Sequence, residues 1–380
     1  MNFELSDEQK DVQKAARNFA QGEFDPDLAL ELDENGAFPE LIWKKACQLG
    51  FIGIHYPEES GGQGLGLFEN LLVIEAFCRV DSGIGTALSL VDLGSEILLK
   101  FGSKEQKKKF LPPLTRGEKR LCTAFAESED RRDLSSIATT VEKKGEEYLL
   151  QGKKQFVLMA SLSNFFIVLC KEPPNRVSTF IVEREENGIE IYPIEKMGLR
   201  MIPYGDLRLK EVLISPDHLI GNGGEGMLHV HHSNQVTGLK SSALALGVAE
   251  GAFDRAMQYA KQREQFGKKL SQFQSIRHKL ADMAVGVEAA RWMTYKAALD
   301  YDQGLNDSEF LLMAQLEVGR RSLDVVDEAL QIFGGYGYIA ETAIEHYFRD
   351  AWTISVELGT EEEQKDLIAK KILGLDSMEK

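Results

Sequence analysis

Three histidines that stand close together are the first residues in this sequence that could do acid–base or metal chemistry. His229, His231 and His232 each carry an imidazole, which titrates near neutral pH and is a common zinc ligand. No cysteine or carboxylate stands at ligand spacing beside them, and the three lie at the start of a predicted helix. We therefore predict no metal site here.

The cysteines do not predict a metal site either. The chain has four of them, and none has the spacing of a metal site or of a disulfide framework. This pattern suits a reducing compartment, in which free cysteines are mostly small core residues. The four are Cys47, Cys78, Cys122 and Cys170.

The overall charge argues against a nucleic-acid partner. The 380 residues include 44 basic and 60 acidic side chains, and the net charge of −16 would repel a phosphate backbone. The chain does not open with basic residues followed by an apolar run, so we expect no secretory signal. It has no stretch of about 18 uncharged apolar residues, so we expect no membrane span and a cytoplasmic location.

The elements that must position any site change in type twice along the chain. Residues 1–118 have the period of helices, with Ser6 as an N-cap; residues 119–225 contain short strand candidates; residues 226–380 are helical again. This order predicts an α+β chain with an N-terminal helical domain, a middle β domain and a C-terminal helical bundle. The expected helices cover about 40–50, 69–79, 91–100, 227–262, 272–302, 308–333 and 360–373, and the expected strands 148–152, 164–170 and 178–182.

Several motifs carry a resemblance to a known family. Residues 196–200 read KMGLR, residues 259–267 read YAKQREQFG, and residues 331–338 read QIFGGYGY. In this order and spacing they resemble the motifs of the acyl-CoA dehydrogenase family, and the resemblance covers the whole chain. Further matching stretches are residues 56–66, 101–107, 349–351 and 359–360.

The resemblance implies both a fold and a chemistry. The family has an N-terminal helical domain, a middle β-barrel or sandwich domain and a C-terminal four-helix bundle. Its members remove an α-proton from a CoA thioester with a glutamate and pass the β-hydride to N5 of FAD. Electrons then leave to an electron-transfer flavoprotein. A homotetramer or a dimer-of-dimers assembly is also implied.

The resemblance further implies that FAD is held in two halves, and the half that binds adenine and pyrophosphate is present in this chain. In the family that half is donated across a subunit boundary. An arginine at its centre offers a permanent charge and fork donors to a pyrophosphate, and paired glycines let the backbone approach closely. The matching residues are Arg263, Phe266, Gln274, Gln331, Gly334 and Gly335.

The half that holds the flavin ring departs from the family pattern. The family's "WITN" motif reads FVLM here, so Phe156 can stack on a ring but Leu158 cannot donate a hydrogen bond. In the loop that resembles "TEPxAGSD", Ala126 has no hydroxyl and Arg132 replaces a small serine. Each lost polar contact is worth about 0.5–1.5 kcal/mol. The resemblance adds Thr360 and Glu362 to the cofactor-binding residues.

The glutamate that the family uses as its base is absent. Its position falls on Leu358, and Glu357 stands one residue earlier. A second branch of the family carries its glutamate where Thr237 stands, followed by an arginine where Gly238 stands. Losing a general base typically lowers a rate by about 10²–10⁴.

Asp92 is the carboxylate best placed to replace the missing base. It lies in the segment that lines the acyl pocket in the family, where it could reach a γ-proton of a cyclic enoyl-CoA. The alternative is that it caps the helical run that follows it. Glu357 is a second candidate, if its helix is shifted by one residue.

Three functions follow, and the sequence leaves all three open. The first is a subunit of a hetero-oligomer that completes the FAD site of a homologous acyl-CoA dehydrogenase subunit while its own centre is impaired. The second is an active homomeric FAD enzyme that uses Asp92 as its base on a cyclic or unsaturated acyl-CoA. The third is a non-enzymatic protein that binds acyl-CoA.

Overall fold

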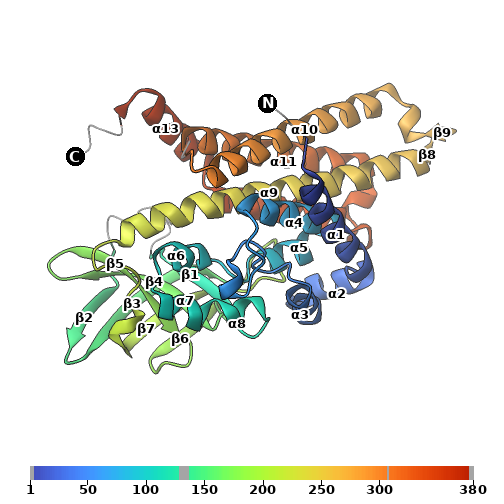
Figure 1. The fold of residues 1–380 in the computed structure, drawn as a ribbon. Coiled ribbons are helices and arrows are strands. Elements are labelled where there is room, and N and C mark those ends of the chain that lie inside the picture. Colours follow the sequence, from blue (N-terminus) through green and yellow to red (C-terminus); the bar gives the residue numbers. More distant parts are fainter. Residues whose placement is uncertain (1–3, 128–136, 306–307, 376–380) are drawn as a thin grey trace.

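The computed structural model describes residues 4–127, 137–305 and 308–375, and it has the predicted α+β class (Figure 1). A helical N-terminal part, a sheet and a long helical C-terminal part follow one another along the chain. In Figure 1 the helices α10 and α11 lie above the long helix α9, and the sheet lies below it.

The N-terminal part is built from helices whose ends have recognisable signals. Ser6 accepts a hydrogen bond from the backbone N–H of Gln9, and the Gln9 side chain accepts one from the N–H of Ser6, so the predicted N-cap is confirmed as a capping box. The helices are α1 (Asp7–Glu23), α2 (Pro26–Asn35), α3 (Glu40–Gln48), α4 (Leu67–Val80), α5 (Ser82–Ser89), α6 (Ser95–Phe101), α7 (Lys104–Phe110) and α8 (Pro112–Thr115).

Two features of this part differ from the prediction. The helix expected over 91–100 begins only at Ser95, and its N-cap is Gly94 in a left-handed conformation, so the interpretation of Asp92 as an N-cap is wrong. Helix α5 was not predicted, because its sequence SGIGTALS is rich in glycine and β-branched or small residues that favour a helix weakly. It is entirely buried, so packing supplies the stability that its sequence lacks.

The middle part is one curled sheet of seven strands. The strand order is β1-β4-β2-β3-β7-β6, and β5 pairs with β4 in antiparallel register, with Phe166 opposite Val182. The strands are β1 (Leu121–Ala124), β2 (Thr140–Lys144), β3 (Glu147–Leu158), β4 (Phe165–Glu172), β5 (Arg176–Glu183), β6 (Ile189–Ile194) and β7 (Tyr204–Ile214).

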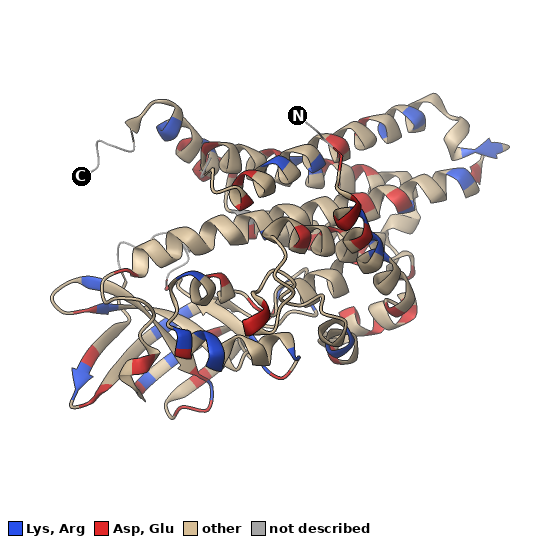
Figure 2. Ribbon diagram, viewed as in Figure 1, with Lys and Arg blue, Asp and Glu red and all other residues tan. Residues whose placement is uncertain are grey.

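The C-terminal part contains α9 (Gly226–Gln262), α10 (Gln274–Asp302), α11 (Ser308–Phe333), α12 (Ile344–Leu358) and α13 (Glu361–Ile372). The short strands β8 (Glu264–Gln265) and β9 (Lys268–Lys269) join α9 to α10 at a basic tip (Figure 2). Helix α12 was not predicted. It starts after Ala343, which has a left-handed backbone and no side-chain cap, so its beginning has no local signal.

The core is continuous across these parts. Helix α9 packs against α4, α10, α11 and α12, and one cluster of buried apolar side chains includes residues from both helical parts and from the sheet. All four cysteines are buried and free, as the sequence predicted. Among the described residues, no helix has the length and apolarity needed to cross a membrane.

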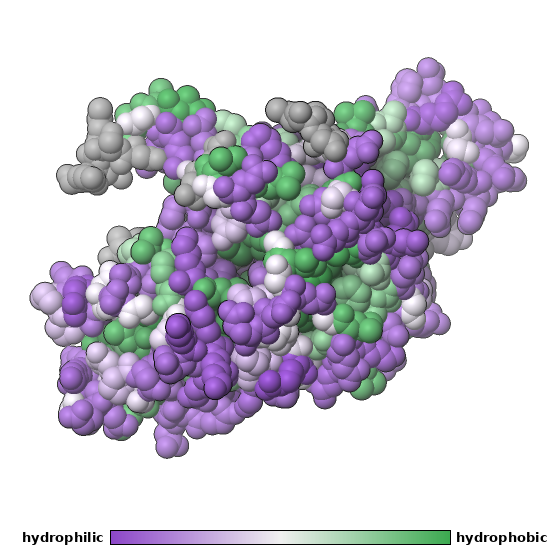
Figure 3. All heavy atoms as spheres, in the orientation of Figure 1, coloured by the Kyte–Doolittle hydropathy of each residue, from purple (hydrophilic) through white to green (hydrophobic). Residues whose placement is uncertain are grey.

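The surface is mainly hydrophilic, with hydrophobic groups gathered on particular elements (Figure 3). One such group lies at the C-terminal end of the described chain, where α13 and the residues after it expose Leu367, Ile372, Leu373 and Leu375. Exposed leucine and isoleucine side chains that gather on one helix are typical of a surface that another protein covers.

Candidate functional site

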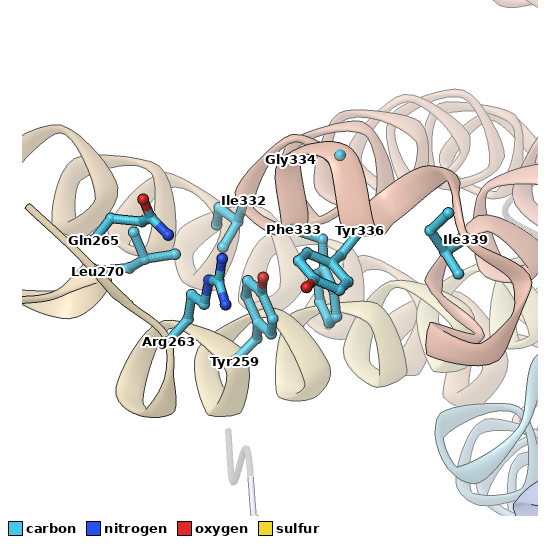
Figure 4. A pocket seen from close by; sticks show the side chains of 10 residues that line it. Tyr259, Arg263, Gln265, Leu270, Ile332, Phe333, Gly334, Tyr336 and Ile339 are labelled. Carbon is cyan, nitrogen blue, oxygen red and sulfur yellow. The ribbon is translucent and has the colours of Figure 1, made fainter.

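A candidate binding cavity lies where α9 ends against the end of α11 (Figure 4). It has a volume of about 540 Å³. Residues near the end of α9 and in the hairpin that follows form one side, and the end of α11 with the 3₁₀ turn η4 (Gly334–Tyr338) forms the other. Its lining residues are Tyr259, Arg263, Gln265, Leu270, Ile332, Phe333, Gly334, Gly335, Tyr336 and Ile339.

The local sequence explains the open wall of this cavity. Gly334 has φ 59°, a left-handed conformation that ends the α11 helix and begins the turn. A Cβ atom added to Gly334 or to Gly335 would meet no other atom within 4 Å. A ligand can therefore approach the backbone of both residues.

Aromatic rings and one cation form the rest of the cavity. The rings of Tyr259 and Phe333 stack with centroids 4.2 Å apart and an interplanar angle of 13°. The guanidinium of Arg263 lies 5.1 Å from the centroid of the Tyr336 ring. Arg263 forms no ion pair with a carboxylate in the described part of the chain, so its charge is available to an anion.

The structure brings only some of the predicted nucleotide-binding residues to this cavity. Arg263, Gly334 and Gly335 line it, whereas Phe266 is 92% exposed on the hairpin beyond it. Gln274 and Gln331 are exposed as well, at the first turn of α10 and near the end of α11. Sequence reasoning missed Tyr259, although it stands one helical turn before Arg263 and therefore on the same face of α9.

Thr360 has a structural role that the sequence analysis did not consider. Its hydroxyl accepts a hydrogen bond from the backbone N–H of Glu363 and caps α13, and the Glu363 side chain accepts one from the N–H of Thr360. Glu362 lies exposed in the first turn of the same helix. The structure thus places both residues at a helix start, away from the cavity at Arg263.

The segment that would face a flavin ring has an unusual backbone. Phe156 and Met159 both have positive φ, at 53° and 58°, and the pairing of β3 with β7 shifts register between Lys154 and Val157. Such conformations are uncommon for residues other than glycine and persist where surrounding packing imposes them. Leu158 packs against the core, and its apolar side chain cannot donate a hydrogen bond to a ligand.

The loop before this segment is tied to the sheet by a buried ion pair. Lys154 is fully buried, and its Nζ lies 2.5 Å from Oε1 of Glu127 and 3.2 Å from the carbonyl oxygen of Phe125. Burial lowers the pKa of Lys154. Burial would raise the pKa of Glu127, but the charge of Lys154 and the hydrogen bonds from Lys154, Thr139 and Ala138 together outweigh burial and lower the pKa. Arg132 lies outside the described residues.

Glu357 and Leu358 end helix α12, and Glu357 is engaged with the sheet. The hydroxyl of Tyr204, on β7, donates to Oε1 of Glu357 at 2.6 Å. Leu358 is the last residue of the helix.

Gly238 stands where the resemblance places the arginine that accompanies the second family base. A Cβ atom added to Gly238 on α9 would lie 1.7 Å from Nε2 of Gln315. Gln315, on α11, therefore fills the space into which an arginine at position 238 would extend.

Asp92 lies at the centre of a buried polar cluster. Lys240 on α9 places its Nζ 2.9 Å from Oδ1 of Asp92, and the hydroxyl of Tyr56 donates to Oδ2 at 2.7 Å. The hydroxyl of Ser95 also faces Oδ2, at 3.4 Å. Asp92 is 4% exposed and Lys240 is 2% exposed.

The cluster keeps Asp92 ionised but makes it a weak base. Burial alone would raise the pKa of Asp92, but the charge of Lys240 and the hydrogen bonds outweigh it and lower the pKa. A carboxylate with a lowered pKa has less tendency to take a proton. Sequence reasoning missed Lys240, although a lysine inside the apolar, small-residue stretch of α9 is a signal of a buried charge pair.

The histidines do not converge on a common point. His229 Nδ1 lies 2.6 Å from Oγ1 of Thr179, and His232 Nδ1 lies 3.3 Å from Nζ of Lys100. No group of three or more histidine, cysteine, aspartate or glutamate residues could hold a metal ion among the residues that the structure describes.

One part of the candidate FAD site fits the cofactor better than the other part. The cavity at Arg263 fits an adenosine diphosphate group, because it combines an available cation, aromatic walls and an open glycine backbone. The ring-side segment does not fit equally well, because Ala126 and Leu158 offer no side-chain hydrogen-bond donors.

Comparison with known proteins covers the whole chain. Residues 6–118, 122–212 and 224–373 match the N-terminal, middle and C-terminal domains of acyl-CoA dehydrogenases. A 3-(aryl)acrylate reductase of Clostridium sporogenes is 36% identical over 95% of this chain and 97% of its own length. A caffeyl-CoA reductase–Etf complex subunit of Acetobacterium woodii is 33% identical over 97% of this chain and 99% of its own length. The structure of butyryl-CoA dehydrogenase from Megasphaera elsdenii superposes with a TM-score of 0.93 at 31% identity, over 98% of this chain and 100% of that one.

Proposed function

The chain belongs to the acyl-CoA dehydrogenase family of FAD-dependent enzymes, and we propose that it works as one subunit of a hetero-oligomer. In this role its C-terminal cavity completes the FAD site of a homologous acyl-CoA dehydrogenase subunit. Its own centre does not carry out the reaction.

The observation that supports this proposal is the contrast between the cavity that would hold the adenosine diphosphate and the carboxylate that could serve as this chain's own base. The cavity at Arg263 is open at the surface and holds a cation that has no carboxylate partner among the residues described. Asp92, the carboxylate that the family resemblance assigns to the acyl pocket, is instead buried and bound by Lys240 and Tyr56. Loss of function without a partner would be expected to erode both alike.

The role of this chain's own residues follows from that cavity. Arg263 would hold the pyrophosphate of the neighbouring subunit's FAD by charge-assisted hydrogen bonds, and the backbone at Gly334 and Gly335 would lie against the adenosine. When bound, FAD accepts a hydride from the acyl chain of a CoA thioester. The proton would be taken by the neighbouring subunit, because Leu358 has no group that can accept one.

An electron-transfer flavoprotein is the proposed electron acceptor of the assembly. The relative from Acetobacterium woodii is a subunit of a complex with Etf, and it aligns with this chain over nearly its full length. This supports an acceptor of the same kind.

The stoichiometry of flavin tests the proposal. The tagged chain is purified from its own host with its bound partners, and FAD is released and counted against the amount of each protein chain. We expect one FAD for each pair of this chain with a homologous acyl-CoA dehydrogenase subunit. One FAD per chain in a homo-oligomer would overturn the proposal.

A second candidate function is supported by the donors around Asp92. Lys240, Tyr56 and Ser95 all converge on its carboxylate and keep it charged, as a base must be before it takes a proton. In a homomeric FAD enzyme acting on a cyclic or unsaturated acyl-CoA, Asp92→Asn should abolish flavin bleaching while FAD stays bound. A flavin-free protein that still binds an acyl-CoA would instead point to the non-enzymatic function.

A further inference from the structure

A second cleft lies apart from the cavity at Arg263, between α1, α4, α9 and α10. Its volume is about 470 Å³, which is within the usual range of small-molecule sites. None of its lining residues lines the cavity at Arg263, and none is Asp92 or a residue that contacts it.

The rim of this cleft carries three basic side chains on α1 and one acidic side chain, Glu4, although the chain as a whole is strongly acidic. Lys10, Lys14 and Arg17 follow one another at i, i+4 and i+7 along α1, so they share one face of that helix. Lys14 and Arg17 form no ion pair within the described chain, and both are exposed. Two unpaired cations on one face are suited to a phosphate or another compact anion.

The floor of the cleft does not repel an anion, because its two carboxyl groups are neutralised. Arg79 and Arg291 both bind Glu250. The hydroxyl of Tyr295 donates to Oε2 of Glu75 at 2.7 Å. Burial and the neighbouring charge of Glu250 raise the pKa of Glu75 well above its usual range, so Glu75 tends to keep its proton.

The floor also offers a hydrogen-bond acceptor. Oε2 of Glu250 is buried without a donor from any nitrogen or hydroxyl group of the described protein. It can be served by the acid proton of Glu75 or by an amine or hydroxyl group of a ligand.

One wall of the cleft carries an exposed aromatic ring. Trp292, on α10, is 43% exposed and lines the cleft beside Tyr295. An indole in this position can stack on a planar ring.

We propose that this cleft binds a nucleoside phosphate. The phosphate lies at Lys14 and Arg17, the base stacks on Trp292, and an amine or hydroxyl group of the nucleoside faces Glu250. The inference does not depend on the hetero-oligomer, because the cleft shares no residue with the cavity that holds the proposed FAD contact.

Isothermal titration calorimetry on the assembled protein tests this proposal, with ADP, adenosine and inorganic pyrophosphate as probes. We expect ADP to bind saturably with one site per chain. Adenosine and pyrophosphate, which each lack one half of the contacts, should bind at least about tenfold more weakly. Pyrophosphate that binds as tightly as ADP would overturn the nucleoside assignment.

Variants separate this cleft from the cavity at Arg263. Lys14→Gln with Arg17→Gln should weaken the binding of ADP at least about tenfold, because two charge-assisted contacts are lost. Lys104→Gln with Lys108→Gln on α7, which removes the same charge elsewhere, should leave the ADP affinity unchanged. Saturable ADP binding should persist in Arg263→Ala, although this variant is expected to lose FAD from the other cavity.

Three outcomes would contradict the proposal. The first is the absence of saturable ADP binding, as expected if another subunit covers the cleft. The second is an affinity that Lys14→Gln with Arg17→Gln does not alter. The third is loss of binding in Arg263→Ala, which would assign the ADP to the other cavity.

Discussion

At the scale of single residues, Arg263 and Asp92 differ in whether their charge is already bound by other side chains. Arg263 faces a cavity and has no carboxylate partner in the described part of the chain, whereas Asp92 has donors at both oxygens. An unpaired arginine is suited to bind a ligand, while a carboxylate in a buried ion pair is suited to hold structure.

Arg263→Ala should lower the FAD content of the whole assembly, because a pyrophosphate would lose its charge-assisted contacts. Arg263→Lys keeps the charge but not the planar fork, so the assembly should retain part of its FAD content. FAD released by acid and measured by absorbance checks both. FAD content equal to that of the unmodified protein in Arg263→Ala would make Arg263 an ordinary surface residue.

Lys240→Met should lower the free energy of unfolding by about 3–5 kcal/mol, because Asp92 would remain buried without its counter-ion. The double variant Asp92→Leu with Lys240→Met should show a smaller fall in the free energy of unfolding, because it leaves no buried unpaired charge. Urea denaturation of the three proteins measures both effects. A double variant less stable than Lys240→Met would show that the pair is not the source of the loss.

His55 should make the protein less stable in mild acid. Burial and the charge of Lys240 lower its pKa to about 4, whereas an unfolded histidine titrates near 6.5. Between these two pH values the unfolded chain binds the proton and the folded chain does not, so stability falls as the pH falls from about 6.5 to 4.

Between pH 7.5 and pH 4.5 the unmodified protein loses free energy of unfolding, and His55→Gln should make that loss smaller by roughly 2–3 kcal/mol. Denaturation curves at the two pH values measure it, and His231→Gln, at an exposed position, is the control. Equal pH dependence in the His55 variant and the unmodified protein would contradict the assigned cause.

At the scale of elements, helix ends separate structural residues from candidate ligand-binding residues. Gly334 ends α11 with an open backbone, and its surroundings form the cavity. Thr360 begins α13 with its hydroxyl already used as a cap. The family resemblance places both residues at the cofactor, but their local geometry differs.

Thr360→Ala should lower the stability of α13 by about 1 kcal/mol, through loss of its N-cap, and leave the FAD content unchanged. Thr360→Ser, which keeps the hydroxyl, should be close to neutral. Thermal unfolding followed by circular dichroism, together with the flavin assay, distinguishes the two roles. A fall in FAD content in Thr360→Ala alone would favour the cofactor role.

At the scale of the whole molecule, the proposed function depends on surfaces that a single chain leaves open. The cavity at Arg263 opens beside the exposed hairpin of Phe266, and α13 carries a second group of exposed apolar side chains. Both would be covered when homologous subunits assemble.

Placing a glutamate at position 358 alone should not produce a complete centre. Leu358→Glu should leave the purified chain colourless and inactive towards butyryl-CoA with an artificial electron acceptor, because Ala126 and Leu158 still give the flavin ring no donors. A colourless chain that becomes active through this single change would contradict both the hetero-oligomer and the Asp92 hypotheses.

Much of the fold was predictable because its signals are local. The capping box at Ser6 lies within four residues, and the long helix that became α9 has a continuous helical period. Helices α5 and α12 were not predictable in this way. The first has weak helix formers and depends on burial, and the second starts without a cap.

The candidate site also has features that local sequence predicts and features that only tertiary packing decides. The sequence alone determined the family pattern, the run from Arg263 to Gly267, the glycine pair and the absence of a glutamate at position 358, because each is a matter of residue type at a fixed spacing. Only the tertiary structure decided the partners of Asp92 and the filling of the space beside Gly238. Lys240 lies 148 residues from Asp92 in the chain, and Gln315 reaches Gly238 from a different helix. Contacts between such distant residues arise from the packing of whole helices, which no local pattern encodes.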